Sequence, residues 1–149
     1  MRALLQRVSR AEVREADDVL GSIGEGLVVL LGVGAHDAPP TADALARKVV
    51  DLRMFADEAG KTNRSLLEID GEMLVVSQFT LYADTRRGRR PGFTPAAPPE
   101  VAEPIYERFC SAVESTGLVV ARGRFGAEMF VELVNEGPFT IWLDTDDSR

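Results

Sequence analysis

The sequence predicts an α+β fold: a largely antiparallel, barrel-like β-sheet core with two helices packed on it, as one domain over residues 1–149. Segments with strand patterning outnumber helical segments by roughly three to one. Most of the links between them are short, which favours antiparallel neighbours. A chain of 149 residues that is 45% hydrophobic and 28% charged also has the size and composition of one soluble globular domain.

The first strands are expected before residue 34. Residues 1–10 alternate in polarity and predict a strand that ties the N-terminus into the sheet. Residues 12–16 and 19–23 flank Asp17-Asp18 and predict a hairpin. Residues 27–33 are a continuous apolar run, which is typical of a central strand buried on both faces.

Two helices are expected. The first begins after Pro39, with Thr41 as its N-cap and Asp43 in its first turn, and continues with apolar residues at helical spacing. The second begins at about Glu100 and stops at Gly117, because glycine readily adopts the backbone conformation that ends a helix. Each helix would bury one apolar stripe against the sheet.

Three further strands are predicted in the last quarter of the chain, over residues 118–121, 129–134 and 139–143. A tight connection at 135–138 would join the last two. Its Gly137-Pro138 bond is expected to be trans on residue type alone, since only about 5–6% of X-Pro bonds are cis in folded proteins.

The stretch at residues 74–82 reads as an apolar strand that ends in polar residues. Strict alternation places Gln78 and Thr80 on one face, so that both can contribute to one site. Ser77 would join them only through its backbone or through a local twist or bulge. Two interpretations stay open: a strand end whose hydroxyls bind nearby backbone groups, or half of a functional site.

The arginines cluster once, in the long irregular stretch 84–99. A loop of this length inside a compact domain is usually functional or mobile. The net charge of −7 argues against broad, sequence-blind coating of nucleic acid, but local positive charge is enough to bind phosphates. The candidate phosphate contacts are Arg86, Arg87, Arg89 and Arg90; the alternative is a solvated charge run.

Few residues of this sequence could support catalysis by histidine, by a thiol or by a bound metal. His36 and Cys110 are the only histidine and cysteine, so no zinc cluster is expected, and no cofactor or metal is predicted. A Ser-His-Asp triad would have to combine His36 with the distant Ser77. The remaining hydroxyls, amides and backbone N–H groups can orient a substrate and stabilise an oxyanion, which suits a reactive ester. One cysteine, no apolar run of membrane-spanning length and no secretory leader pattern predict a cytoplasmic protein without a membrane partner.

Two motifs resemble the signatures of D-aminoacyl-tRNA deacylases, Ser-Gln-x-Thr and Asn-x-Gly-Pro-x-Thr. They are Ser-Gln-Phe-Thr at residues 77–80 and Asn-Glu-Gly-Pro-Phe-Thr at 135–140. The likeness extends to residues 6–10, 86–91 and 123–129. Either motif alone is weak evidence for this family, but the two motifs together, in order and at family spacing, are strong evidence. One departure is Phe139, where the family usually has valine, which would add bulk beside the second motif.

The resemblance implies a homodimeric enzyme that hydrolyses the ester between a D-amino acid and the 3′ end of tRNA, with mischarged glycyl-tRNA as a second substrate. It implies that a cis Gly137-Pro138 peptide enters the partner subunit's pocket and excludes L-amino acids. Arg7 would orient this motif, which Asn135 and Thr140 complete. The pocket for the terminal adenosine and the scissile carbonyl would comprise Ser77, Gln78, Phe79 and Thr80. Substrate contacts are also expected from Phe125 and Met129.

Two mechanisms and two other functions remain as alternatives. Thr80 could attack as a nucleophile, although no base is visible to activate it. Otherwise the 2′-hydroxyl of the terminal ribose assists a water, while N–H groups near Phe79 and Thr80 hold the oxyanion. The other functions are a non-catalytic module that binds the tRNA end, and an editing deacylase of different stereochemistry similar to the domain attached to some archaeal threonyl-tRNA synthetases.

Overall fold

The long strand β1 (Arg2–Glu15) organises the sheet in the computed structural model, which describes residues 1–86 and 88–147. One edge of β1 pairs antiparallel with β8 (Phe130–Asp144) from Arg2 opposite Asp144 to Arg14 opposite Phe130. Its other edge pairs antiparallel with β3 (Gly26–Gly32) and then with β2 (Asp18–Ile23). The terminal strand, the hairpin and the central strand that the sequence predicts are therefore confirmed.

Two parallel pairs extend this sheet. β6 (Glu72–Ser77) runs parallel to β3, and β7 (Val120–Arg122) runs parallel to β6. An ideal Cβ at Gly21 of β2 would lie 3.1 Å from Ala121 Cβ of β7, so the sheet curls until its two ends nearly meet. The α+β, barrel-like fold is confirmed, but its sheet is mixed, because a helix separates β3 from β6 and another separates β6 from β7.

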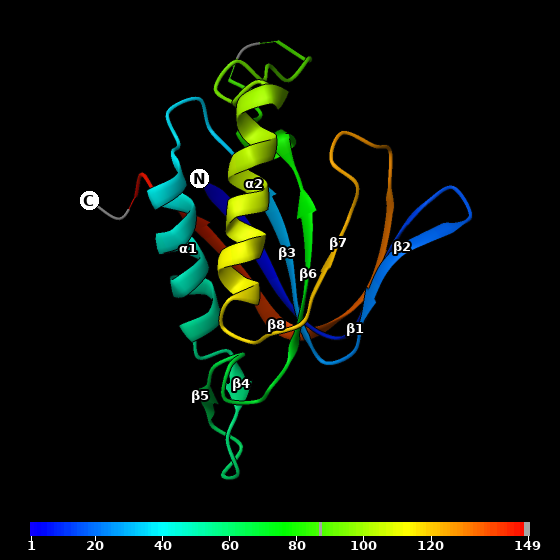
Figure 1. Cartoon of the computed structure of the whole chain (residues 1–149), viewed down its shortest axis with the longest axis vertical. Helices are drawn as coiled ribbons and strands as arrows, with labels where there is room; N and C mark the ends of the chain where they lie inside the picture. The colour runs from blue at the N-terminus through cyan, green and yellow to red at the C-terminus, as the bar shows by residue number, and fades with distance from the viewer. Residues whose placement is uncertain (87, 148–149) are drawn as a thin grey trace.

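Helices α1 (Pro39–Asp51) and α2 (Pro99–Glu114) lie side by side over one face of the sheet (Figure 1). Arg108 Nε donates to Asp43 Oδ1 at 2.6 Å and links the two helices. The predicted N-cap is wrong, because α1 begins at Pro39 and its N-cap is Ala38. Thr41 lies inside the first turn, where its Oγ1 accepts a hydrogen bond from Ala38 N at 3.5 Å. Gly117, with φ of +93°, ends the second helix as predicted.

The core has a part on each face of the sheet. The larger part lies between the sheet and the helices, with Phe109, Tyr106 and Leu27 fully or almost fully buried. The smaller part fills the curl on the opposite face, around Val28 and Leu74. A short hairpin, β4 (Phe55–Ala56) and β5 (Thr62–Arg64), lies at the end of the molecule away from the loop 84–98 (Figure 1).

Three expected boundaries are corrected. The strands expected at 1–10 and 12–16 are one strand, and the hairpin turns at Ala16-Asp17, one residue earlier than the expected Asp17-Asp18. The strands expected at 129–134 and 139–143 are also one strand, β8, whose pairing with β1 shifts register near Val8. Finally, the stretch 74–82 is a strand only to Ser77, because Phe79–Tyr82 forms a 3-10 helix, η1. Among the described residues no helix is long and apolar enough to cross a bilayer.

Candidate functional site

The site lies where β6 ends and η1 begins. Gln78 N donates to Leu31 O of β3 at 2.8 Å, after which the chain leaves the sheet. The glycine at the end of β3 permits this turn, because an ideal Cβ at Gly32 would lie 3.1 Å from Gln78 O and 3.2 Å from the Tyr82 ring. The carboxyl ends of neighbouring parallel strands, here β3 and β6, are a common place for a binding site in sheets covered by helices.

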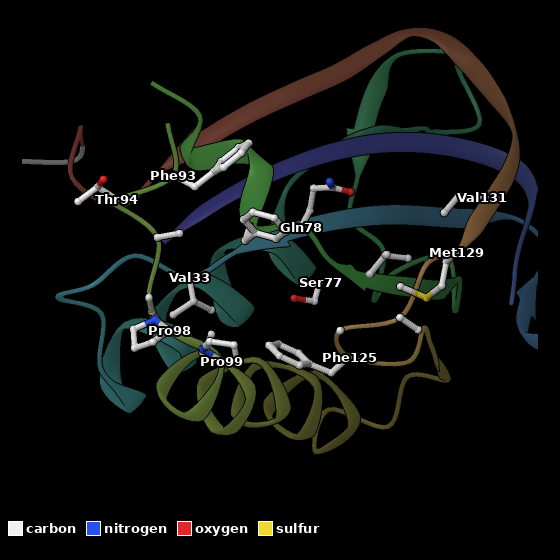
Figure 2. A pocket seen from close by; sticks show the side chains of 17 residues that line it. Val33, Ser77, Gln78, Phe93, Thr94, Pro98, Pro99, Phe125, Met129 and Val131 are labelled. Atoms are coloured by element: carbon white, nitrogen blue, oxygen red, sulfur yellow. The ribbon is translucent and has the colours of Figure 1, made fainter. Parts of the chain in front are cut away.

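A pocket of about 620 Å³ opens at this point (Figure 2). Its volume lies within the usual range of small-molecule sites. Ser77 and Gln78 lie midway between its two ends in Figure 2, and Ser77 Oγ has no hydrogen-bond partner among the described residues. The lining is mainly apolar and carries no acidic side chain: Val33, Val76, Ser77, Gln78, Phe79, Phe93, Thr94, Ala96, Ala97, Pro98, Pro99, Ala102, Phe125, Gly126, Ala127, Met129 and Val131.

One end of the pocket is closed by the connection between β7 and β8. Phe125 packs against Tyr106 of α2, with ring centroids 5.9 Å apart. The Met129 side chain packs against the first residues of this connection, and its Sδ accepts a hydrogen bond from Arg124 N at 3.2 Å. Gly123 makes room for it, since an ideal Cβ there would lie 2.7 Å from Met129 Sδ. Phe125 and Met129, the two candidate substrate contacts taken from the sequence, therefore both line the pocket.

The Ser-Gln-Phe-Thr motif is divided between the pocket and the surface. Ser77, Gln78 and Phe79 line the pocket, and Thr80 does not. Thr80 Oγ1 instead accepts a hydrogen bond from Nε2 of Gln78, which does line the pocket. Gln78 and Thr80 are therefore neighbours, but through the turn of η1 rather than through the strand alternation that the sequence suggested.

The Asn-Glu-Gly-Pro-Phe-Thr motif lies inside β8, away from the pocket of its own chain. The Gly137–Pro138 bond is cis, as the resemblance implies and against the expectation from residue type, and both residues are exposed. Asn135 Nδ2 donates to Arg7 O at 2.9 Å and to Phe139 O at 3.0 Å, which holds the ends of this segment together. None of these residues lines the pocket, so one chain does not bring the two motifs together.

Arg7 packs beneath this segment. Its Nη1 donates to Met54 O at 2.6 Å, and its guanidinium carbon lies 4.2 Å from the centroid of the Phe139 ring. Arg7 Nε is buried 3.5 Å from Glu136 Oε2, an ion-pair contact without a hydrogen bond. Phe139, which is larger than the valine usual in the family, therefore stabilises the position of the Arg7 guanidinium by a cation–π contact. Thr140 Oγ1 accepts a bond from Gln6 Nε2 at 3.2 Å.

The arginine-rich loop is closed at its base by backbone hydrogen bonds between Asp84 and Gly92, at 2.7 and 2.9 Å. Arg86 forms three hydrogen bonds to the Asp84 carboxylate, two from its guanidinium and one from its backbone N–H, and these hold the pKa of Asp84 well below its usual range. Arg89 and Arg90 are exposed and have no hydrogen-bond or ion-pair partner among the described residues. Arg87 lies outside the described residues, and the other three arginines do not line the pocket.

The groups that could act as strong bases or nucleophiles lie elsewhere. His36 lines a second pocket of about 520 Å³ with Asp37 and Tyr82, so it forms no triad with Ser77. Burial and the Asp37 carboxylate raise the pKa of Tyr82, which keeps its phenol neutral. Burial also raises the pKa of Cys110 to about 12, which makes this thiol a poor nucleophile. The first pocket must act through hydroxyls, an amide and backbone groups.

The sequence did not single out several residues of the pocket wall. They are Val33 after β3, Phe93 and Thr94 after the arginine loop, Pro98 before α2 and Pro99 at its start. Phe93 had one sequence feature that could have revealed it: it is the only aromatic residue in the stretch 84–99.

A family model described as D-Tyr-tRNA(Tyr) deacylase matches residues 4–144. A D-aminoacyl-tRNA deacylase of Roseiflexus sp. (strain RS-1) is 59% identical over 97% of this chain and 94% of its own length. Another, of Symbiobacterium thermophilum, is 57% identical over 98% of this chain and 97% of its own.

Two solved structures share the fold. One, titled c-Myc DNA Unwinding Element Binding Protein, has a TM-score of 0.91 at 39% identity and covers 97% of this chain and 99% of its own. A probable eukaryotic D-amino acid tRNA deacylase has a TM-score of 0.80 at 20% identity, with coverage of 95% and 97%. A family model that spans nearly the whole chain, together with relatives of such identity, shows that this protein belongs to the D-Tyr-tRNA(Tyr) deacylase family.

Proposed function

We propose that this protein hydrolyses the ester bond that joins a D-amino acid to the 3′ end of tRNA. The observation that carries the proposal is the pocket at the end of β6, which combines the unpaired Ser77 hydroxyl and the Gln78 amide with two apolar ends. Such a pocket can hold an adenosine and an aminoacyl group, and it supplies no strong base. An aminoacyl ester is reactive enough to be hydrolysed by orientation and oxyanion stabilisation.

We infer that a second copy of the chain completes the site. Gly137 and Pro138 are exposed and do not line the pocket of their own chain, so they would act on a substrate in another subunit. β8 also exposes large apolar side chains, with Trp142 at 45% and Phe130 at 60% of their surface. Exposed apolar patches of this kind mark protein interfaces.

In this dimer the backbone of Gly137 and Pro138 would occupy the space into which the side chain of an L-amino acid projects. A D-amino acid directs its side chain elsewhere, and glycine has none, so mischarged glycyl-tRNA would also be a substrate. Arg7 and Asn135 would keep the segment in place, through the contacts with Phe139 and Glu136 described above.

Hydrolysis follows the substrate-assisted route. The 2′-hydroxyl of the terminal ribose orients a water that attacks the ester carbonyl carbon, and the bond to the 3′-oxygen breaks as that oxygen takes up a proton. The backbone N–H groups of Phe79 and Thr80 open η1 and therefore lack intrahelical acceptors, so they would stabilise the oxyanion, although the Thr80 side chain is not part of the pocket lining. Transfer RNA is the partner, and Arg89 and Arg90 would contact its phosphates. We place the reaction in the cytoplasm, where tRNA is aminoacylated.

The test is incubation of the purified protein with D-tyrosyl-tRNA and L-tyrosyl-tRNA. We expect release of D-tyrosine and protection of the L-ester. Release of L-tyrosine at a similar rate would contradict the chiral filter and favour an editing enzyme of other stereochemistry. Binding of tRNA without release of either amino acid would favour a non-catalytic module.

Removal of the Thr80 hydroxyl is expected to lower kcat for D-tyrosyl-tRNA less than about tenfold. The hydroxyl accepts a hydrogen bond from Gln78 Nε2 and is not part of the pocket lining, so its loss affects the orientation of the amide but no reacting group. Loss of a true nucleophile costs on the order of 10⁶-fold. Single-turnover rates of Thr80→Ala and of the equally bulky Thr80→Val check this. Abolished turnover in both, with substrate binding retained, would make Thr80 the nucleophile.

A further inference from the structure

An aromatic pair lies at the end of the pocket opposite Phe125 and Met129. The Phe79 and Phe93 rings meet edge to face, with centroids 5.0 Å apart. Phe79 is 54% exposed, and Phe93 is partly exposed. Figure 2 shows Phe93 and Thr94 at this end, with Ser77 between them and Phe125. This aromatic surface is therefore continuous with the pocket and open to solvent.

The segment that carries Phe93 is held at both ends. Gly92 forms two backbone hydrogen bonds with Asp84 on one side. On the other side, Ala97 N donates to Val33 O at 2.9 Å, and Ala35 N donates to Pro95 O at 3.1 Å. Phe93 is thus fixed to the end of β3 rather than placed on the free part of the arginine loop. A ring that is already ordered loses little conformational entropy when a ligand stacks on it.

Positive charge adjoins this end of the pocket. Arg89 and Arg90, which have no ion-pair partner among the described residues, belong to the loop that closes at Gly92, next to Phe93 in the chain, whereas Arg86 pairs with Asp84. Figure 1 shows this loop at the end of the molecule where β6 ends and α2 begins. No acidic side chain lines the pocket. An exposed aromatic surface beside arginines is the combination that binds single-stranded nucleic acid, by base stacking and by contacts with phosphate.

We propose that Phe93, together with Phe79, stacks on the base of the nucleotide that precedes the terminal adenosine of the substrate. The terminal adenosine then lies toward Ser77 and Gln78, and the arginine loop faces the phosphate between the two nucleotides. The protein would hold at least two nucleotides of the single-stranded 3′ end, and Phe93 would be a positioning residue. This proposal rests on the proposed function.

The test compares two short esters that differ by one nucleotide, D-tyrosyl-adenosine and D-tyrosyl-CpA. In Phe93→Ala we expect KM for the dinucleotide ester to rise about tenfold, with kcat little changed, because stacking of one base is lost. KM for the adenosine ester should stay within about twofold of wild type, since that ester has no base to stack there. Phe93→Trp, which keeps an aromatic face, should retain the wild-type preference for the dinucleotide.

Binding of uncharged CpA and adenosine, measured by calorimetry, separates this proposal from the proposed function. A wild-type protein that hydrolyses neither ester would contradict the function, while tighter binding of CpA that depends on Phe93 would still support the stacking surface. Equal KM changes for both esters, or no change for either, would overturn it. Conversion of a dimer to a monomer by Phe93→Ala would also overturn it, by showing that a second subunit covers this surface.

Discussion

Replacement of Gly137 by alanine is expected to lower the deacylation of D-tyrosyl-tRNA about 100-fold, because misplacement of substrate by about 1 Å can cost that much. The free energy of unfolding should stay within about 0.5 kcal/mol of the wild-type value, as for most surface substitutions. An ideal Cβ at Gly137 meets no atom of its own chain within 4 Å, so the methyl group is tolerated there. In the proposed dimer the same methyl group enters the partner subunit's pocket.

Subunit mixing gives this prediction a sharper form. A Gly137→Ala subunit keeps an intact pocket, and a Ser77→Phe subunit, whose pocket is filled, keeps an intact motif. If the motif acts in trans, a mixture of the two inactive proteins regains about a quarter of wild-type activity, because half of the dimers are mixed and each has one intact site of two. No recovery in a mixture that demonstrably contains mixed dimers would mean that the motif acts within its own chain or not at all.

Replacement of Gly26 by alanine is expected to destabilise the fold by about 3 kcal/mol or more, the upper end of the cost of overpacking a core. An ideal Cβ at Gly26 would lie 1.8 Å from Glu72 O and 2.8 Å from Glu72 N, so the parallel pair of β3 and β6 must separate to admit it. That pair carries Ser77 to its position opposite Leu31. Loss of the pairing therefore removes the support of the pocket as well.

Gly24→Ala is the matched control for this variant. An ideal Cβ at Gly24, two residues earlier, would lie 3.6 Å from Glu72 Oε2, an ordinary contact with a side chain. Urea unfolding should show a much lower midpoint for Gly26→Ala and a midpoint close to wild type for Gly24→Ala. Equal midpoints for the two variants would mean that glycine at residue 26 is not required for strand approach.

Local patterning predicted the elements better than their connections. The apolar run before Gly34 is a buried central strand, and the helical stripes before Leu52 and Gly117 are α1 and α2, since each pattern reflects burial of one face. β6 has a helix before it and a helix after it, and such long connections allow parallel pairing with β3 and β7. The short links elsewhere in the chain led instead to the expectation of antiparallel neighbours.

Errors arose where a contact with a distant segment overrides the local preference. β-Type alternation continues past Ser77, but the chain turns there, because β3 ends at Gly32 and offers no further partner. Asn135 and Pro138 read as a loop, yet β1 pairs with β8 on both sides of them and makes one strand. Thr41 is a favourable N-cap residue, but the two prolines before it already start the helix.

The sequence by itself offered the candidates for the site: Ser77, Gln78, Phe79 and Thr80 for the pocket, and Gly137 and Pro138 for a second element. It also determined that histidine and cysteine chemistry would be scarce, since these follow from residue identity. Only the tertiary structure decided which motif residues meet. It left Thr80 out of the pocket lining, brought Phe93 in from a loop, and left the Gly137–Pro138 peptide exposed in β8. Such proximity depends on strand order and on the turn after β6, which arise from contacts between segments that are distant in the chain.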